Sequence, residues 1–364
     1  RKCLKRLTTG LVPAYTEVSN IIAERRFREE PADEPVMKRR ERLLNRLKRW
    51  MEIQLGRARW SDKTIKAAAM AKWKSYSNKI PPLSAAEFYR AYFPDEATYR
   101  PAASKRKPIV IPPEDLPILA YIHLRLYGSA EPAYDHIVID EAQDYSPLQL
   151  AVLAGRQRIP SLTVLGDLQQ GIHDYAGIRS WTELSDLFAK EDTAYYELDR
   201  SYRSTTEIIE FANRILAGMD GEVKPAVPVF RSGDPVETVA LEASSSALAK
   251  EIASTIQAWS GGSGISTIAV LCRTAAKSKL LHAELQQAGV EAALLQADQQ
   301  AYHGGITVLP SYLSKGLEFD AVILADADRE SYASEDAKLL YVACTRALHR
   351  LKVLYQGEPS ALIV

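Results

Sequence analysis

Cysteine is scarce in this sequence, and its three copies, Cys3, Cys272 and Cys344, lie far apart. That number and spacing exclude a disulfide framework and the closely spaced pairs of a zinc site. Such use of cysteine is typical of a reducing compartment, so we expect a cytoplasmic protein. Long apolar runs are also lacking: no stretch approaches the roughly 20 residues of a membrane-spanning helix. We therefore expect no membrane segment.

A net charge is lacking as well, since 46 Lys and Arg balance 46 Asp and Glu. The balance hides an uneven distribution. Residues 1–107 hold 26 basic and 12 acidic side chains, whereas residues 108–364 hold 20 and 34. A basic first third and an acidic remainder indicate separate roles, one of which is contact with an anionic partner.

Residues 1–107 are predicted to form a basic, mostly helical domain that carries no motor motif. Leu43, Leu47 and Trp50 recur at helical spacing within a predicted helix over 37–59, and Lys and Arg fill many other positions. This pattern fits a helix that docks on nucleic acid or protein. It fits equally a long solvated helix with one apolar stripe. The sequence leaves both interpretations open.

From residue 115 onward, strand and helix patterns alternate, which predicts parallel sheets. Strands are expected at 137–139, 162–165, 194–198, 236–241, 265–272, 292–295, 306–309, 321–325 and 351–355. Helices are expected near 115–126, 205–217, 246–259, 275–288 and 334–348. We therefore predict an α/β fold with two parallel-sheet domains, 108–218 and 235–364. A Gly- and Pro-rich linker, 219–234, would join them.

An acidic segment, Asp140-Glu141-Ala142-Gln143-Asp144, follows the apolar run 137–139, which is predicted to be a buried strand. In open α/β sheets, ligands bind outside the carboxyl ends of strands. An Asp there can hold Mg²⁺ on nucleotide phosphates, and a neighbouring Glu can orient or deprotonate water. The alternative is an acidic cap on a core strand, ahead of a helix that begins at Pro147. This segment alone does not decide between them.

Three further clusters carry phosphate chemistry. Gly166-Asp167-Leu168-Gln169-Gln170 follows the next strand, where a glutamine amide can sense a terminal phosphate; a polar loop is the alternative. Tyr202-Arg203 offers a stacking face and a guanidinium that forks onto phosphate oxygens. Lys315-Gly316-Leu317-Glu318 and Arg346 lie in the second domain, from which an Arg can reach a phosphoryl group. Each Arg alone is explained as well by a surface salt bridge.

In this order the clusters resemble the motifs of superfamily 1 helicases of the UvrD/Rep type. The matching segments are 140–144 for motif II, 166–170 for motif III, 201–204 for motif IV, 315–319 for motif V and 342–347 for motif VI. Leu309-Pro310-Ser311-Tyr312, Asp144-Tyr145-Ser146 and the short connection between motifs IV and V resemble the HelD/helicase IV branch. The resemblance implies two RecA-like motor domains, the first incomplete, with residues 1–107 as an insertion.

The resemblance also implies how ATP and Mg²⁺ are bound. Asp140 would hold the magnesium ion, and Glu141 would be the catalytic base. Gln170 would contact the terminal phosphate and the attacking water. Arg203 and Arg346 would clamp the phosphates from the two domains.

Further roles follow from the same resemblance. Tyr202 would stack on adenine, and Glu318 would bind the ribose with Lys315 close by. Family positions that touch single-stranded nucleic acid fall on aromatic and imidazole side chains that can stack on bases. They are His173, Tyr175 and Tyr312.

The sequence also departs from the family. The Gly-x-x-x-x-Gly-Lys-Ser/Thr phosphate loop is absent, and the plain loop 261–264 is no substitute, because no Lys follows it. The sequence begins at Arg1 without Met, so we expect a fragment. Because it lacks the backbone amides and the Lys of the phosphate loop, we expect this fragment to bind ATP weakly and not to hydrolyse it usefully. Ala176 stands where relatives carry Arg, and Tyr312 where they usually carry His. Both differences argue against efficient coupling of hydrolysis to unwinding.

The predicted function is that of an ATP-hydrolysing motor in the intact protein, with single-stranded DNA as the expected nucleic-acid partner. Proteins of the HelD type bind RNA polymerase and release it from nucleic acid, so the resemblance also implies that partner. One alternative is a processive 3′-to-5′ DNA helicase of the helicase IV kind. Another is a docking scaffold without catalysis, against which the catalytic set Glu141, Gln170, Arg203 and Arg346 argues.

Overall fold

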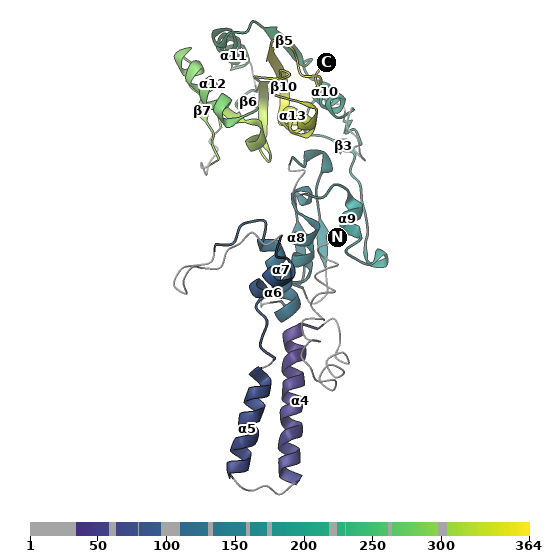
Figure 1. Cartoon of the computed structure of the whole chain (residues 1–364). Coiled ribbons are helices and arrows are strands. Elements are labelled where there is room, and N and C mark those ends of the chain that lie inside the picture. The colour runs from purple at the N-terminus through teal and green to yellow at the C-terminus, as the bar shows by residue number, and fades with distance from the viewer. Residues whose placement is uncertain are drawn as a thin grey trace. The chain divides into compact units, whose positions relative to one another are not determined.

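The computed structural model describes residues 34–57, 63–78, 80–95, 110–129, 134–157, 161–172, 177–217, 224–229, 231–260, 264–297 and 304–364. The chain divides into two compact units, and the division falls between Leu165 and Gly166 (Figure 1). We call residues 1–165 unit 1 and residues 166–364 unit 2. This division falls inside the predicted domain 108–218, and the predicted domain bounds stay a prediction.

Unit 1 is mainly helical. Its helices are α4 (Val36–Arg57), α5 (Lys63–Asn78), α6 (Ala85–Tyr92), α7 (Leu116–Tyr127) and α8 (Pro147–Ala154). The predicted helix over 37–59 is confirmed as α4. Its first turns pack Val36, Met37 and Leu43 into a core with Phe88 of α6 and Ile122 of α7. The amphipathic stripe of α4 is therefore a core face over that part of the helix.

The strands of unit 1 are β1 (Ile137–Ile139) and β2 (Leu162–Val164), which pair in parallel. Between them, Pro147 opens α8, and Ser146 and Gln149 form a capping box at its start. The apolar run 137–139 is the predicted strand, but the prediction that it is buried holds only for Ile139, since Val138 is 61% exposed. A continuous apolar run predicts a strand that is buried on both faces of its sheet. The sheet of β1 and β2 has only two strands, and one face of β1 is exposed at Val138.

The strand predicted at 194–198 is wrong. These residues have no regular secondary structure, and Tyr195, Tyr196 and Leu198 are exposed. A strand needs a neighbour for its backbone hydrogen bonds, and none of the described residues pairs with this segment. A short strand follows instead, β3 (Arg200–Ser201), which pairs with β4 (Val227–Pro228) inside the predicted linker.

Unit 2 contains a six-stranded sheet in which every strand pair is parallel. The spatial order of its strands is β5-β10-β9-β6-β8-β7. The strands are β5 (Glu237–Leu241), β6 (Ile268–Cys272), β7 (Ala293–Leu294), β8 (Ile306–Pro310), β9 (Phe319–Leu324) and β10 (Ala347–Gln356). The predicted α/β fold with parallel strands is confirmed here, and this sheet is consistent with the predicted RecA-like domain.

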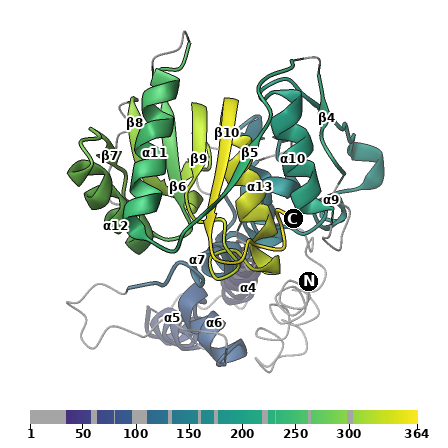
Figure 2. The ribbon, with the colours of Figure 1, turned by 90° about the horizontal axis from the view of Figure 1, so that it is seen from above.

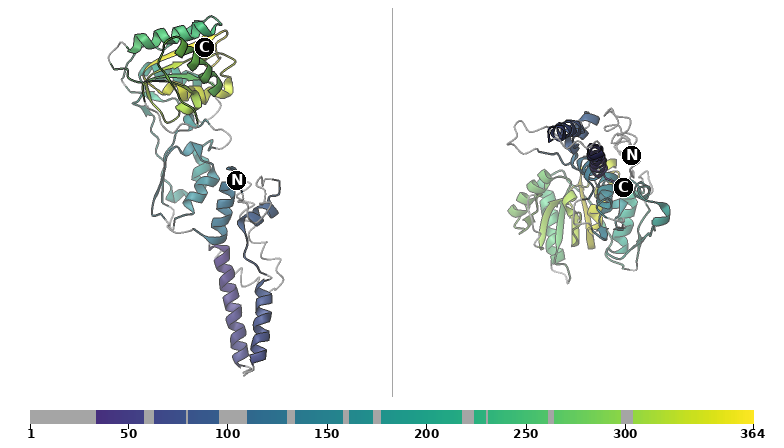
Figure 3. Two further views of the ribbon diagram at one scale, coloured as in Figure 1. Left: turned by 90° about the vertical axis from the view of Figure 1, so that its left-hand side faces the viewer. Right: turned by 90° about the horizontal axis from the view of Figure 1, so that it is seen from below.

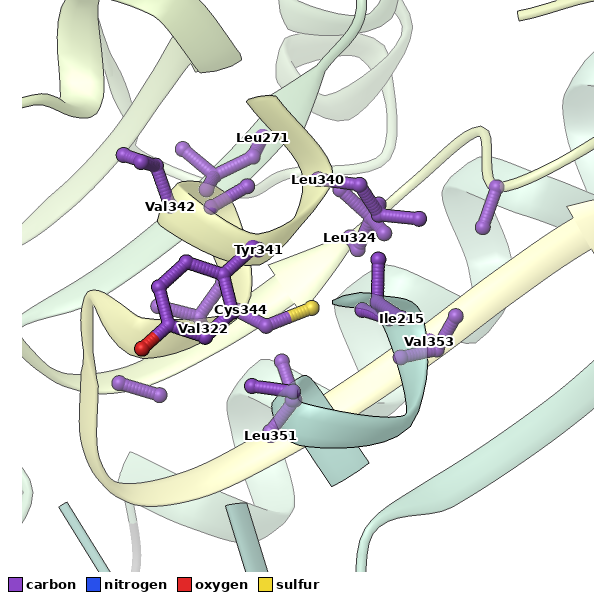
Figure 4. Close-up of a cluster of buried hydrophobic side chains, with 14 of the residues drawn as sticks. Ile215, Leu271, Val322, Leu324, Leu340, Tyr341, Val342, Cys344, Leu351 and Val353 are labelled. Carbon is purple, nitrogen blue, oxygen red and sulfur yellow. The ribbon is translucent and has the colours of Figure 1, made fainter. Parts of the chain in front are cut away.

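Helices cover both faces of this sheet (Figure 2). On one side lie α11 (Ser245–Ser260) and α12 (Ala275–Gln287), and on the other α10 (Thr206–Leu216) and α13 (Ala337–Thr345). Side chains along β9 alternate between the two cores: Ala321 and Ile323 pack with α11 and α12, whereas Val322 and Leu324 pack with α10 and α13 (Figure 4). Burial on both faces explains the continuous apolar runs of the central strands.

Asp320 joins β9 to the segment before β6. Its Oδ2 accepts hydrogen bonds from the backbone N–H and hydroxyl groups of Ser266 and Thr267, at 2.7 to 3.1 Å. Burial alone would raise the pKa of this carboxyl group, but the four hydrogen bonds lower it to about 2. Among the helices that the structure describes, none is long and apolar enough to cross a membrane.

Candidate functional site

The acidic segment of unit 1 sits at the carboxyl end of β1, as predicted. Asp140 and Glu141 are exposed there. Glu141 has φ 52° and ψ 41°, the left-handed region, and no other described residue except glycine has a positive φ. Such a backbone costs about 1 kcal/mol or more and occurs preferentially at functional sites. The N–H of Ala142 donates to the carbonyl of Leu165 over 2.9 Å and fixes this turn to the end of β2.

Gln143 orients the carboxylate of Glu141. Its side chain is buried, and its Nε2 donates to Oε2 of Glu141. The backbone N–H of Glu141 donates to Oδ1 of Asp140 over 2.8 Å. The two carboxylates are therefore held in fixed directions by their own segment. Gln143 lies in the predicted motif, but the sequence indicated no role for it. The available signal was a polar residue two positions after the proposed base.

In unit 2 the structure brings Gln170 and Arg346 into direct contact. Arg346 follows α13, is 2% exposed, and donates from Nη2 to Oε1 of Gln170 over 2.9 Å. Its Nε donates to the carbonyl of Val342 over 3.1 Å and its Nη1 to the carbonyl of Leu317 over 3.4 Å. A buried guanidinium needs such acceptors because an unpaired buried charge is costly.

Gln170 is held from three directions. Its Nε2 donates to Oδ2 of Asp167 over 2.9 Å, and its carbonyl accepts from Nζ of Lys315 over 2.9 Å. Asp167 caps the 3₁₀ turn Leu168–Gln170 by accepting from the N–H of Gln169. The amide of Gln170 thus has a fixed orientation, and its neighbours include two cations, Lys315 and Arg346. Asp167 had no predicted role, although its place in the Gly-Asp-x-x-Gln segment was visible.

Arg203 pairs with Glu318 in the same unit. The distance between Nη2 of Arg203 and Oε1 of Glu318 is 2.9 Å, and both side chains are about half exposed. Arg231 donates to the carbonyl of Arg203 over 2.6 Å, and the buried hydroxyl of Ser204 donates to the carbonyl of Ala347 over 2.6 Å. Motif IV is therefore fastened to β10. Arg231 thus supports the backbone of Arg203, and no sequence pattern indicated this role.

We call Asp167, Gln170, Arg203, Lys315, Glu318 and Arg346 the phosphate cluster. Three of these six side chains are cations and two are anions, and the cations come from three separate segments of the chain. Guanidinium and ammonium groups gathered in this way are suited to an anionic ligand such as a nucleotide phosphate. Asp167, Lys315 and Arg346 all contact Gln170, and Arg203 contacts Glu318. Arg346 also donates to the carbonyl of Leu317, the residue before Glu318. The predicted contacts with ATP themselves stay a prediction.

Of the four side chains predicted to stack on adenine or on bases, the structure describes Tyr202 and Tyr312. Tyr202 is 67% exposed, and its ring is accessible for stacking. Tyr312 is 37% exposed and lies on the 3₁₀ turn Ser311–Ser314. Ser311 fixes that turn, since its Oγ lies 2.6 Å from the hydroxyl of Tyr332 and donates to the carbonyl of Cys272 over 3.1 Å. His173 and Tyr175 lie outside the described residues.

Tyr341 and the two buried cysteines of unit 2 are neutral near pH 7. Burial, together with the negative charge of Asp167, raises the pKa of Tyr341 far above its ordinary value. Burial raises the pKa of Cys344 to about 12, and burial and Asp326 raise that of Cys272. Neither thiol is therefore a nucleophile near neutral pH. Within the described part of the chain, no group of three or more His, Cys, Asp or Glu side chains could hold a metal ion by itself.

Comparison with known proteins agrees with these motifs. Two family models, both described as a UvrD-like helicase C-terminal domain, match residues 196–304 and 305–354. The ATP-dependent DNA helicase UvrD2 of Mycobacterium tuberculosis is 34% identical over 174 residues, which are 43% of this chain and 23% of that protein. DNA helicase IV of Escherichia coli is 28% identical over 260 residues, which are 63% of this chain and 35% of that protein.

A solved structure is also similar, the C-terminal domain of a possible DNA helicase from Lactobacillus plantarum. It is 30% identical and covers 45% of this chain and 92% of its own, with a TM-score of 0.38. The chain thus spans between 23% and 35% of the length of the two curated relatives above. The two family models together extend over motifs IV, V and VI, which hold four of the six residues of the phosphate cluster.

Proposed function

Because the chain belongs to the UvrD/Rep-like helicases of superfamily 1, we propose that it is part of an ATP-hydrolysing motor that acts on single-stranded DNA. The observation that carries the proposal is the contact between Gln170 and Arg346, held by Asp167 and Lys315. A scaffold without catalysis has no need of a buried arginine aimed at a glutamine. Phosphoryl transfer requires an arginine that stabilises the charge of the transition state, next to a residue that contacts the terminal phosphate.

The residues of this chain fit ATP and Mg²⁺ as ligands. Asp140 would hold the magnesium ion together with the nucleotide phosphates, because no described cluster could hold it alone. The ion would neutralise charge on the phosphates. Glu141, oriented by Gln143, would hold the attacking water and accept its proton. Arg203, Lys315 and Arg346 would bind phosphate oxygens, while Tyr202 would stack on adenine and Glu318 would bind the ribose.

We further propose that the intact protein binds RNA polymerase and releases it from nucleic acid. This role is supported by the resemblance of 144–146 and 309–312 to the HelD branch, and by the basic residues 1–107. The loss of the motif III arginine at Ala176 also favours a remodeller over an efficient unwinding enzyme. The relatives reported above are named as DNA helicases, which supports DNA as the nucleic acid.

The experiment is ATP turnover by the intact protein and its Glu141→Gln variant. The protein is measured alone, with single-stranded DNA and with RNA polymerase. Loss of the base should lower turnover by about 100-fold or more, while nucleotide binding is retained. Glu330→Gln, a change at an exposed glutamate outside the motifs, is the matched control and should leave turnover unchanged.

Each outcome has a distinct meaning. Strong stimulation by DNA alone supports a translocating helicase. Stimulation by polymerase, with little response to DNA, supports a remodeller of the HelD kind. Full turnover by Glu141→Gln would refute the assignment of the base, and the absence of turnover under every condition would favour the scaffold.

A further inference from the structure

The helices α4 and α5 lie side by side as a hairpin, which is visible in Figure 1 and in the left view of Figure 3. Its base is anchored. Val36, Met37 and Leu43 are in the core of unit 1, and Nε of Arg40 donates to the carbonyl of Ile80 over 2.8 Å. The base therefore has a structural role that its contacts explain fully.

The far end of the hairpin is different. Beyond Lys48, α4 continues for about 13 Å at 1.5 Å per residue, and the residues there whose exposure the structure describes are all exposed. They are Arg49, Trp50, Glu52, Ile53 and Gly56. In that part Trp50 is 63% exposed and Ile53 47% exposed, and Met70 on α5 is 41% exposed. Large apolar side chains gathered on one exposed element are typical of interaction surfaces. We call residues 46–57 and 63–74 the hairpin tip.

The hairpin tip is strongly basic. It holds eight Lys and Arg but only one acidic residue, Glu52. Arg49 and Trp50 are adjacent and both exposed on α4, and Lys63 is exposed at the start of α5. A solvated helix would explain the cations but not the exposed tryptophan between them. Cations that bind phosphates, combined with an aromatic ring on which a base can stack, are the means by which proteins bind single strands.

We propose that the hairpin tip binds single-stranded nucleic acid, with Arg49 and Lys63 on phosphates and Trp50 stacked on a base. This contact is separate from the motor motifs, which all lie after residue 139. It deepens the proposed function, on which it rests, because it gives the intact protein a second hold on the strand. A strand held at two places stays bound while the motor motifs release it.

The test is the affinity for a fluorescent oligothymidylate, measured by anisotropy over a salt series without nucleotide, with the full chain and its variants. The double variant Arg49→Ala/Lys63→Ala should bind at least fivefold more weakly at low salt. The slope of log affinity against log salt should fall by about 1.4, which corresponds to two phosphate contacts on a single strand. Trp50→Ala should bind about fivefold more weakly or worse with the slope unchanged.

The matched control is Lys250→Ala/Arg329→Ala, which removes two exposed cations from unit 2. It should bind like the parent chain, and circular dichroism should show that every variant keeps its helix content. Equal weakening by this control, or unchanged binding by the hairpin variants, overturns the inference. So does a hairpin variant that binds the oligonucleotide normally but no longer binds RNA polymerase, because the tip would then be a protein-docking surface.

A further variant separates this inference from the proposed function. Tyr312→Ala removes a predicted contact of the motor motifs with the strand. If Tyr312→Ala weakens binding and the hairpin variants do not, the hairpin inference fails and the proposed function stands. If the hairpin variants weaken binding and Tyr312→Ala and Glu141→Gln change nothing, the hairpin binds nucleic acid and the motor assignment fails.

Discussion

The guanidinium of Arg346 donates to the side-chain carbonyl of Gln170 over 2.9 Å and joins positions 176 residues apart. The glutamine belongs to the segment predicted to sense a terminal phosphate, and the arginine to the segment predicted to stabilise it. Both partners have further hydrogen bonds, so a displacement of either side chain disturbs the other. Predictions about catalysis therefore begin with this pair.

Replacing Arg346 with Lys should abolish turnover without abolishing nucleotide binding. Lysine keeps the charge but cannot donate in the three directions that the guanidinium uses. We expect ATP turnover of the intact protein to fall about 1,000-fold, with the nucleotide Kd raised by less than about tenfold. Arg329→Lys, at a 75% exposed side chain, is the control. Turnover near the parent value in Arg346→Lys would show that the fork geometry is not needed.

Tyr202→Ala should weaken nucleotide binding more than nucleic-acid binding. The ring is 67% exposed and next to Arg203, so its removal leaves the hydrogen bonds of the phosphate cluster in place. Loss of one stacking contact predicts an increase in nucleotide Kd of about fivefold or more. Binding of an adenine nucleotide and of an oligonucleotide is measured on the same preparation of the intact protein. Equal effects on the two ligands would contradict the adenine-stacking role.

Asp320 should give unit 2 an acid-sensitive step. Its pKa is about 2 in the folded chain, below its ordinary value of 3.8, so its contribution to stability is present above about pH 4. That contribution is lost as the pH falls from about 4 towards 2, where the folded chain is protonated. Asp320→Asn should cost about 1–2 kcal/mol at pH 7 and flatten the loss of stability over this window.

Urea unfolding at pH values from 7 to 2 measures this effect, with Glu358→Gln as an exposed carboxylate control. An Asp320→Asn variant with the same pH dependence as the parent chain would show that another carboxyl group dominates acid unfolding.

Tyr332→Phe should reveal whether the turn that carries Tyr312 needs its buried clamp. The ring of Tyr332 is 1% exposed and its hydroxyl lies 2.6 Å from Oγ of Ser311. Phenylalanine keeps the packing and removes one hydrogen bond, which should lower the free energy of unfolding by about 1 kcal/mol. Affinity for single-stranded DNA should fall severalfold, to the same extent as in Ser311→Ala. Additive effects in the double variant would argue that the two hydroxyls act independently.

The sequence was a good guide where one segment buries two faces or caps itself. The strands predicted at 265–272 and 321–325 correspond to β6 and β9, and the structure buries nearly every residue of these two strands. The helix start predicted at Pro147 depends on equally local contacts, because Ser146 and Gln149 form a capping box around it. The capping box needs no distant partner, and a strand that is buried on both faces shows this in its own continuous apolar run. Both features could therefore be predicted from neighbouring residues.

Prediction failed where the state of a segment depends on remote neighbours. The segment 194–198 has strand composition, yet Leu198 is 96% exposed and the strand forms two residues later. Val138 is apolar and still 61% exposed. Composition gives the preference for a strand, but pairing and burial depend on which other strand lies alongside.

The order of the motif segments in the sequence by itself indicated the resemblance to superfamily 1 helicases of the UvrD/Rep type, and models of a UvrD-like helicase C-terminal domain match residues 196–354. Only the tertiary structure decided how the motif residues meet. It joined Arg346 to Gln170, paired Arg203 with Glu318, and left Trp50 and Ile53 exposed at the end of a basic hairpin. The hydrogen bond between Arg346 and Gln170 joins residues 176 positions apart, and the exposure of a helix face depends on what packs against it. Both depend on packing between distant segments, which no local pattern encodes.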